Sequence, residues 1–266
     1  MPAVFVLLAT LVFGPALMAD TSAPRDAPFY ATSSIVNSAD NQAGPLAPNT
    51  IGTIYGKGLS YVTRALAPED VIGGVLPNGL PGTGVNILIG GVPANIFYVS
   101  PAQINFLVPC ILRPGRTDLQ IVMNGISGPL VPFDLASSSP AIFQLDAQTV
   151  IAVKLDGSLV TSDAPARPRD IIVIYATGLG DTVPAEIFGN VAAMAAPLKQ
   201  LADFKLLLDG VAVDRSLVLY AGIAPGFAGL YQINLRLPDG VGSNPQIQIG
   251  LADALSPAGL ILPLKP

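Results

Sequence analysis

The sequence predicts an all-β chain built from two tandem β-sandwich repeats. Three observations predict this architecture: apolar residues alternate along short segments, turn-forming residues separate these segments, and two sequence blocks occur twice in the same order. Glycine (27 residues) and proline (26 residues) are frequent, and only 12% of the residues are charged while 51% are hydrophobic. This composition is typical of short strands joined by tight turns.

Two blocks of the first half of the chain recur in the second half. Residues 54–60 (IYGKGLS) recur as residues 174–180 (IYATGLG), and residues 103–109 (QINFLVP) recur as residues 232–238 (QINLRLP). The blocks keep their order and nearly keep their spacing, which indicates a tandem duplication.

Within the repeats the apolar period is two, as in a strand with one face in a core and the other toward solvent. This alternation predicts strands over residues 85–89, 103–108, 119–123 and 231–237. Each repeat has the length of an immunoglobulin-like sandwich.

These lengths predict a first immunoglobulin-like sandwich over residues 31–138 and a second over residues 139–266. The segment 137–140 (SSSP) is the expected joint between them. Residues 185–203 are rich in alanine, and we expect a long connection there with at most one helical turn.

The N-terminus has the pattern of a secretory signal peptide. An apolar run over residues 3–18 is broken by Gly14-Pro15, and small residues precede the polar segment that follows. A membrane anchor is the alternative, but the run is shorter than the ~20 residues that span a bilayer. We therefore expect a signal peptide over residues 1–19, a flexible lead-in over residues 20–30, and a secreted or cell-surface protein with no membrane span after cleavage.

Several segments together resemble an uncharacterised C-terminal domain family of secreted proteins from soil acidobacteria (Solibacter-type). The segments are residues 35–39 (IVNSA), 47–56 (APNTIGTIYG), 97–106 (FYVSPAQINF), 174–180 and 224–234 (APGFAGLYQIN). A second, weaker resemblance is to the immunoglobulin-like IPT/TIG modules of surface proteins. It rests on a Pro-led turn that is followed by a strand and then by Gly-x-Gly-Leu. The resemblance implies an extracellular module attached to larger proteins, and it supplies no catalytic residue.

The chain departs from this family at three positions. The family usually has glycine where this chain has Asn49 and Arg169, and an aromatic residue where Cys110 stands. Asparagine tolerates a left-handed backbone, whereas arginine does so poorly, so Arg169 predicts a type I turn.

The composition excludes several classes of site. The chain has no histidine and one cysteine, so it can build neither a Ser-His-Asp site nor a thiolate zinc cluster. Its net charge is −5 with scattered Lys and Arg, which argues against nucleic-acid binding. No calcium-loop spacing occurs among the aspartates, and Gly82-Thr83-Gly84 is interpreted as a turn. We expect no catalytic residue, no cofactor and no metal.

The most prominent repeated polar residues are Gln103 with Asn105, and Gln232 with Asn234. They could form an amide-lined surface for a sugar or a peptide, or they could satisfy backbone groups of the adjoining Tyr-x-x-Pro loop. Their presence in both repeats favours the structural role. Cys110 is expected at a partly exposed turn, either as a plain small residue or as half of an intermolecular disulfide.

The sequence thus favours a non-catalytic, secreted or cell-surface binding or structural module. We expect it to present loops or strand edges to an extracellular protein or polysaccharide. The alternative is a carbohydrate-binding module or a minimal Asp-based carbohydrate hydrolase.

Overall fold

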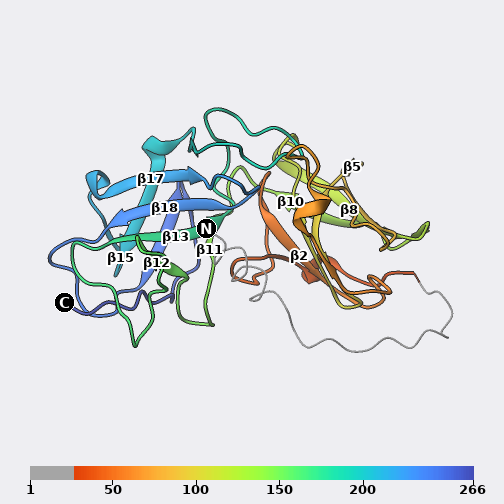
Figure 1. Cartoon of the computed structure of the whole chain (residues 1–266). Coiled ribbons are helices and arrows are strands. Elements are labelled where there is room, and N and C mark those ends of the chain that lie inside the picture. The colour runs from red at the N-terminus through yellow and green to blue at the C-terminus, as the bar shows by residue number, and fades with distance from the viewer. Residues whose placement is uncertain (1–26) are drawn as a thin grey trace.

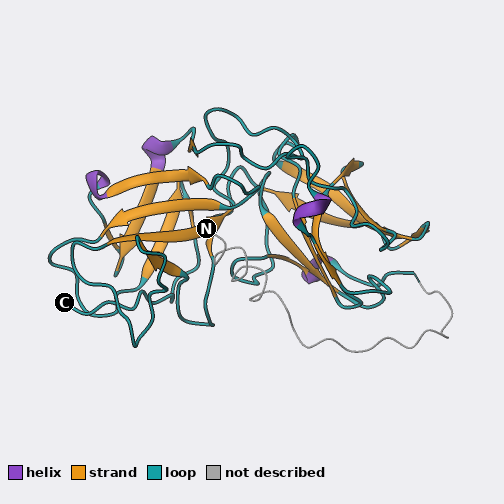
Figure 2. Ribbon diagram, in the orientation of Figure 1, coloured by secondary structure: helices purple, strands orange, loops and turns teal. Residues whose placement is uncertain are grey.

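The computed structural model describes residues 27–266, so the expected signal peptide lies outside the described residues. Strands and loops make up almost all of this region, and helix is confined to four short 3₁₀ turns (Figure 2). The turns are Thr32–Ser34, Pro68–Asp70, Leu201–Asp203 and Arg215–Leu217. The prediction of an all-β fold is confirmed.

Residues 27–138, called the first half below, form two antiparallel sheets (Figure 1, red to yellow-green). One sheet has the order β1-β2-β7-β6-β3, and the other has the order β10-β8-β4-β5 with β9 paired to β8. The strands are β1 (Ile35–Asn37), β2 (Ile51–Tyr55), β3 (Arg64–Ala65), β4 (Val85–Ile89), β5 (Val92–Pro93), β6 (Asn95–Val99), β7 (Gln103–Leu107), β8 (Gly115–Met123), β9 (Ile126–Ser127) and β10 (Val131–Leu135).

Residues 139–266, the second half, form two further sheets (Figure 1, green to blue). One has the order β11-β13-β18-β17-β14 with β12 also paired to β13, and the other has the order β16-β15-β19-β20. The strands are β11 (Ala141–Ile142), β12 (Ala152–Lys154), β13 (Ile171–Thr177), β14 (Ala196–Pro197), β15 (Phe204–Leu208), β16 (Val211–Ala212), β17 (Val218–Ile223), β18 (Tyr231–Arg236), β19 (Ile247–Leu251) and β20 (Ala254–Leu255).

The duplicated blocks form neighbouring strands in each half. In the first half β2 pairs with β7, with Ile54 opposite Ile104. In the second half β13 pairs with β18, with Ile174 opposite Ile233. The strand order around each pair is the same in both halves.

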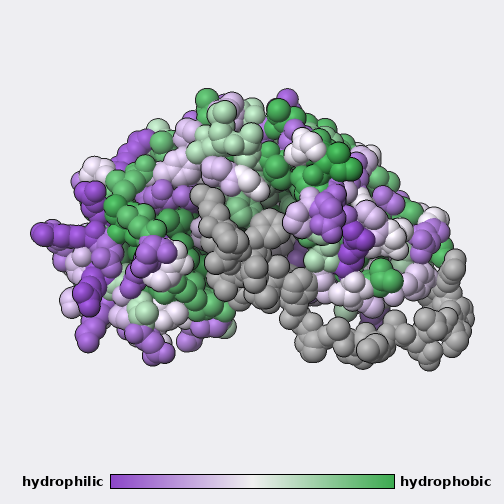
Figure 3. Space-filling view, viewed as in Figure 1, coloured by the Kyte–Doolittle hydropathy of each residue, from purple (hydrophilic) through white to green (hydrophobic). Residues whose placement is uncertain are grey.

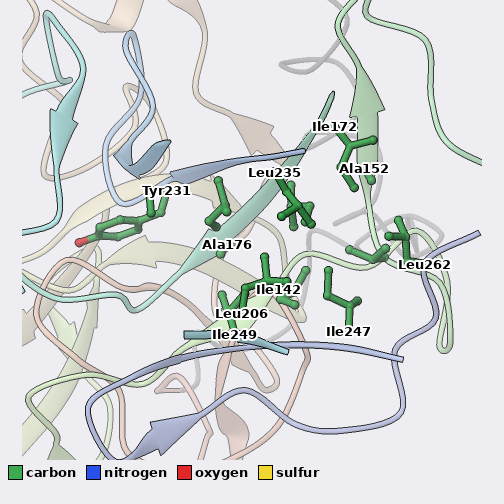
Figure 4. Close-up of a cluster of buried hydrophobic side chains, with 14 of the residues drawn as sticks. Ile142, Ala152, Ile172, Ala176, Leu206, Tyr231, Leu235, Ile247, Ile249 and Leu262 are labelled. Carbon is green, nitrogen blue, oxygen red and sulfur yellow. The ribbon is translucent and has the colours of Figure 1, made fainter. Parts of the chain in front are cut away.

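Each half buries its own apolar core, as the alternation predicts. Ile104, Phe106 and Val108 point into the core of the first half and are fully buried. The second core gathers side chains from both of its sheets (Figure 4), and Tyr231 lies at one end of this cluster with its hydroxyl oxygen directed away from the other labelled side chains.

One strand departs from the expected burial. The alternation predicts that one face of β7 is exposed, yet Gln103, Asn105 and Leu107 are all buried as well. Leu107 packs against Ala228 of the second half, whereas Asn105 bonds to Gln103 and to Thr53 within the first half.

The turn at Arg169 is also different from the prediction. Arg169 has a φ of 71°, close to the 64° of its counterpart Asn49, so both are left-handed and neither belongs to a type I turn. The same backbone bond closes both turns, because Asn49 N donates to Val108 O at 2.9 Å and Arg169 N donates to Leu237 O at 3.0 Å; the guanidinium of Arg169 also pairs with the carboxylate of Asp239.

The remaining loop predictions have mixed outcomes. The segment 185–203 is a connection that holds the short strand β14 and one 3₁₀ turn, as expected. Thr83 forms a turn through its hydroxyl, which donates to Leu80 O at 2.7 Å. The sequence predicts a flexible lead-in up to residue 30, but Phe29 pairs with Lys57 and Tyr30 is only 3% exposed. Residues 29 and 30 therefore belong to the folded first half.

Candidate binding cleft at the junction between the two halves

The expected joint between the halves is held by hydrogen bonds. The Ser139 N–H donates to Gly178 O at 2.8 Å, and the Ser139 hydroxyl donates to Pro45 O at 2.7 Å. The side chain of Asn37 donates to Ser139 O at 3.2 Å. The chain passing between the halves is thus anchored on both sides.

Backbone contacts continue along the rest of the junction. The Ile51 N–H donates to the Thr177 hydroxyl at 2.9 Å. On another side, Leu76 N donates to Gly189 O at 2.7 Å and Val191 N donates to Gly74 O at 2.9 Å. These bonds join a loop of each half in a strand-like pairing.

A cleft of about 670 Å³ opens at this junction. One wall is the first-half loop over residues 38–42, and the other walls are second-half residues 143–148 and 257–260. Among its lining residues, Ala39, Phe143, Ile151 and Leu260 are buried and apolar. The cleft therefore needs both halves.

The rim of the cleft is polar and has no cationic side chain among its lining residues. Amide side chains come from Asn41, Gln42, Gln144 and Gln148. Amides both donate and accept hydrogen bonds, so this lining suits a neutral polar ligand.

Two aspartates line the cleft, one on each side. Asp40 Oδ1 accepts the N–H of Gln42, and Asp146 Oδ1 accepts the N–H groups of Gln148 and Thr149. Burial raises the pKa of Asp40, whereas the backbone and side-chain hydrogen bonds lower the pKa of Asp146. Both carboxylates thus hold turns of the walls.

The sequence-predicted amide pairs bond within themselves rather than to a loop backbone. Gln103 Nε2 donates to Asn105 Oδ1 at 2.9 Å, and the Thr53 hydroxyl donates to the same oxygen at 3.1 Å. Thr53 lies 2.7 Å from the hydroxyl of Ser38, which lines the cleft. The expectation of bonds to the Tyr-x-x-Pro backbone is wrong for these side chains, because neighbouring polar residues on the same sheet face satisfy them first.

The second pair repeats only part of this arrangement. Gln232 Nε2 donates to Asn234 Oδ1 at 2.8 Å, the same bond as in the first repeat. Neither residue lines the cleft. Of the two pairs, only the first is connected to the cleft.

A buried polar cluster is formed by Asn49, Cys110, Glu186 and Tyr231 and lies at the junction outside the cleft; Asn49 and Tyr231 are buried in it, whereas Cys110 and Glu186 are partly buried. Asn49 Nδ2 donates to Glu186 Oε2 and contacts the Tyr231 hydroxyl at 3.2 Å. The Tyr231 hydroxyl also donates to Gly180 O. Cys110 is partly buried, and its Sγ lies 3.9 Å from the backbone carbonyl oxygen of Glu186, so the cysteine contacts the loop of the second half.

Burial controls the ionisation of this cluster. Burial, together with the nearby Asp181 carboxylate, raises the pKa of the Glu186 carboxyl from its ordinary 4.5 to about 7, although the hydrogen bond from Asn49 lowers it. Burial also raises the pKa of the Cys110 thiol to about 11. The ion pairs among the described residues do not include Glu186, so no cation compensates its charge.

Sequence reasoning missed both the cleft and Glu186. The cleft walls come from loops about 100 residues apart, and no local pattern joins them. One signal was available for Glu186: it is one of only two glutamates in a chain that otherwise uses aspartate.

Comparisons with known proteins assign no family. No protein-family profile and no curated protein matches the chain. Among solved structures it is similar to the Bacteroides ovatus SGBP-B of a mixed-linkage glucan utilization locus, in complex with a mixed-linkage heptasaccharide (12% identity, TM-score 0.33, 92% of this chain and 44% of that chain).

It is also similar to the surface glycan-binding protein PbSGBP-B of Prevotella bryantii (11%, TM-score 0.27, 91% and 42%). A third similarity is to the extracellular region of plexin A4 (11%, TM-score 0.28, 95% and 17%). The chain spans less than half the length of each of these proteins.

Residues 27–266 contain neither a helix that could span a membrane nor a group of side chains that could hold a metal ion. No helix in this range has the length and apolar character needed to cross a bilayer. In the same range, no group of three or more Cys, Asp or Glu side chains lies close enough together to hold a metal ion.

Proposed function

We propose that this chain is an exported, non-catalytic binding module whose cleft holds a segment of a neutral polysaccharide. The cleft is the observation that supports this function. Its volume of about 670 Å³ is within the ~300–1,000 Å³ typical of ligand sites, and its walls come from both halves.

The lining chemistry supports a neutral, hydroxyl-rich ligand. Each amide at the rim can accept from one hydroxyl and donate to another. No Lys or Arg of the lining could pair with an acidic sugar or a phosphate, and Asp40 and Asp146 would repel either one. Tyr55, 41% exposed, donates to Asn41 at the rim and offers an aromatic surface for a sugar ring.

Export follows from the N-terminal sequence. The expected signal peptide over residues 1–19 places the chain at the cell surface or outside the cell. A neutral polysaccharide of an outer surface or of a plant wall is available to a protein in that location.

The test is affinity electrophoresis of the mature chain through gels that contain one polysaccharide each, neutral or acidic. We expect a neutral polysaccharide to retard the protein and an acidic one to leave its mobility unchanged. Gln42→Ala and Gln148→Ala remove one exposed amide from each wall, and each is expected to weaken binding about 10-fold, as for the loss of one ligand hydrogen bond. Gln200→Ala, exposed and outside the cleft, is the matched control.

Two outcomes contradict the proposal. In the first, Gln42→Ala and Gln148→Ala bind a retained polysaccharide as well as Gln200→Ala does, which places the site elsewhere. In the second, no polysaccharide retards the chain and it is captured instead by a larger envelope protein.

Two aspartates with opposite pKa shifts favour a second candidate function, a glycoside hydrolase. A raised pKa suits a general acid and a lowered one suits a base or nucleophile, and Asp40 and Asp146 line the same cleft. We favour binding because each carboxylate is held in a turn by backbone N–H groups. Release of reducing ends from a retained polysaccharide, abolished by Asp40→Asn, would establish the hydrolase.

A further inference from the structure

The second half inserts a partly buried carboxylate into the junction with the first half. Glu186 belongs to a second-half loop, yet its carboxylate accepts a hydrogen bond from Asn49, 137 residues earlier in the chain. The flanking residues of this loop are exposed, with Val183 at 56% and Ile187 at 69%. A partly buried acidic side chain is thus carried by a surface loop that can present it to water.

The groups that face Glu186 are neutral or acidic. They come from four elements: Asn49 from the turn before β2, Cys110 after β7, Tyr231 from β18, and Asp181 from the same loop as Glu186. Tyr220 of β17 also senses the charge of Glu186, and the nearest ion pair of the loop joins Asp181 to Lys199 at 3.3 Å.

An uncompensated charge in this position opposes closure of the junction. Moving an ionised carboxylate out of water is costly unless a cation or several donors replace the water. Here the side-chain amide of Asn49 donates to the carboxylate, and Asp181 repels it. The neutral acid has no such cost.

We propose that Glu186 is a proton-dependent latch between the two halves, closed when its carboxyl is neutral and loosened when it ionises. The cleft has walls from both halves, so loosening the latch is expected to weaken the binding of a cleft ligand as well. That consequence rests on the proposed function, whereas the latch itself does not.

The direction of the pH effect follows from the raised pKa. The carboxyl titrates near 7 in the closed junction and near its ordinary 4.5 when exposed. The closed state is therefore favoured most below about pH 4.5 and loses this advantage as the pH rises toward 7. Between about pH 5 and pH 8, linkage predicts that opening becomes roughly 70-fold more frequent.

The test is amide hydrogen exchange of the full mature chain without ligand, corrected for intrinsic exchange at each pH. The reporters are the amides of Leu76 and Val191, whose bonds join the two halves beside the loop. We expect their protection to fall roughly 70-fold between about pH 5 and pH 8 in the natural sequence. Glu186→Gln keeps the shape and an acceptor oxygen but cannot ionise, so its protection is expected to stay constant.

The chain supplies its own control. Glu69 is the only other glutamate and is exposed in the first half, so Glu69→Gln is expected to behave like the natural sequence. Equal pH dependence in the natural sequence and in Glu186→Gln overturns the latch, and it leaves the polysaccharide proposal standing.

A second measurement covers the case in which Glu186→Gln does not fold. Selective carbon-13 labelling of glutamate carboxyls gives two NMR signals, one for each glutamate. One of them is expected to titrate near neutral pH. If both titrate below about pH 5.5, Glu186 is not buried as a neutral acid and the latch is excluded.

Discussion

Replacing Gly178 by alanine tests how closely the joint between the halves packs. Gly178 has a φ of +78°, and a Cβ there would lie 2.0 Å from the carbonyl oxygen of Ser139. Its duplicated counterpart, Gly58, has a φ of +63° with no atom within 4 Å of the equivalent position. The two glycines share a backbone conformation and differ only in what surrounds them.

The magnitudes follow from this difference. A left-handed alanine costs about 1–2 kcal/mol at either site, and the smaller entropy of the unfolded chain offsets about 0.4–1 kcal/mol of it. At Gly178 the clash must also displace the Ser139 backbone, which adds about 1–3 kcal/mol. This displacement breaks the 2.8 Å hydrogen bond from Ser139 N to Gly178 O, which contributes about 1 kcal/mol. We expect Gly58→Ala to lose about 1 kcal/mol and Gly178→Ala about 3–5 kcal/mol.

Urea unfolding of the mature protein and of each variant measures these losses. A common m-value is needed for the comparison, because a change in m would signal that the halves unfold separately. If Gly178→Ala is no less stable than Gly58→Ala, the joint is not packed against Gly178 and the close contact with Ser139 is refuted.

Two further predictions concern the buried polar cluster. Tyr231→Phe removes the hydroxyl that bonds Gly180 and Asn49, and we expect it to lower the free energy of unfolding in urea by about 1–3 kcal/mol. Tyr55→Phe at the surface is the control and should change this free energy by less than about 0.5 kcal/mol. Equal losses of stability in the two variants would contradict the buried role of the Tyr231 hydroxyl. Because burial raises the pKa of the Cys110 thiol from 9.0 to about 11, alkylation at pH 8 is expected to be roughly 100-fold slower in the folded chain than in urea. Equal rates before and after unfolding would show that the thiol is exposed.

The parts of the fold that the sequence predicts are those that depend on local pattern. Alternation around Ile104 and Phe106 predicts a strand because a period of two fits only an extended chain with one face in a core. The duplicated blocks predict a common strand order, since identical patterns make the same pairs.

The rest depends on which segments meet across the junction. Leu107, on the face of β7 expected to be exposed, is buried because Ala228, more than 100 residues later, comes to lie against it. Arg169 adopts a left-handed backbone against its propensity in a turn whose N–H donates to Leu237 O, 68 residues away. No local window of sequence contains both partners of either contact.

The two copies of the duplicated unit have diverged according to what covers them. Asn49 and Cys110 of the first half correspond to Arg169 and Asp239 of the second. The first pair is covered by the loop that carries Glu186, and the second pair is an exposed salt bridge with side chains 78% and 64% accessible. An aspartate at position 110 would place a second carboxylate beside a buried one, and like charges in a low-dielectric site repel strongly. The covered position therefore favours a neutral residue such as Cys110, whereas the open position accommodates the Arg169–Asp239 ion pair.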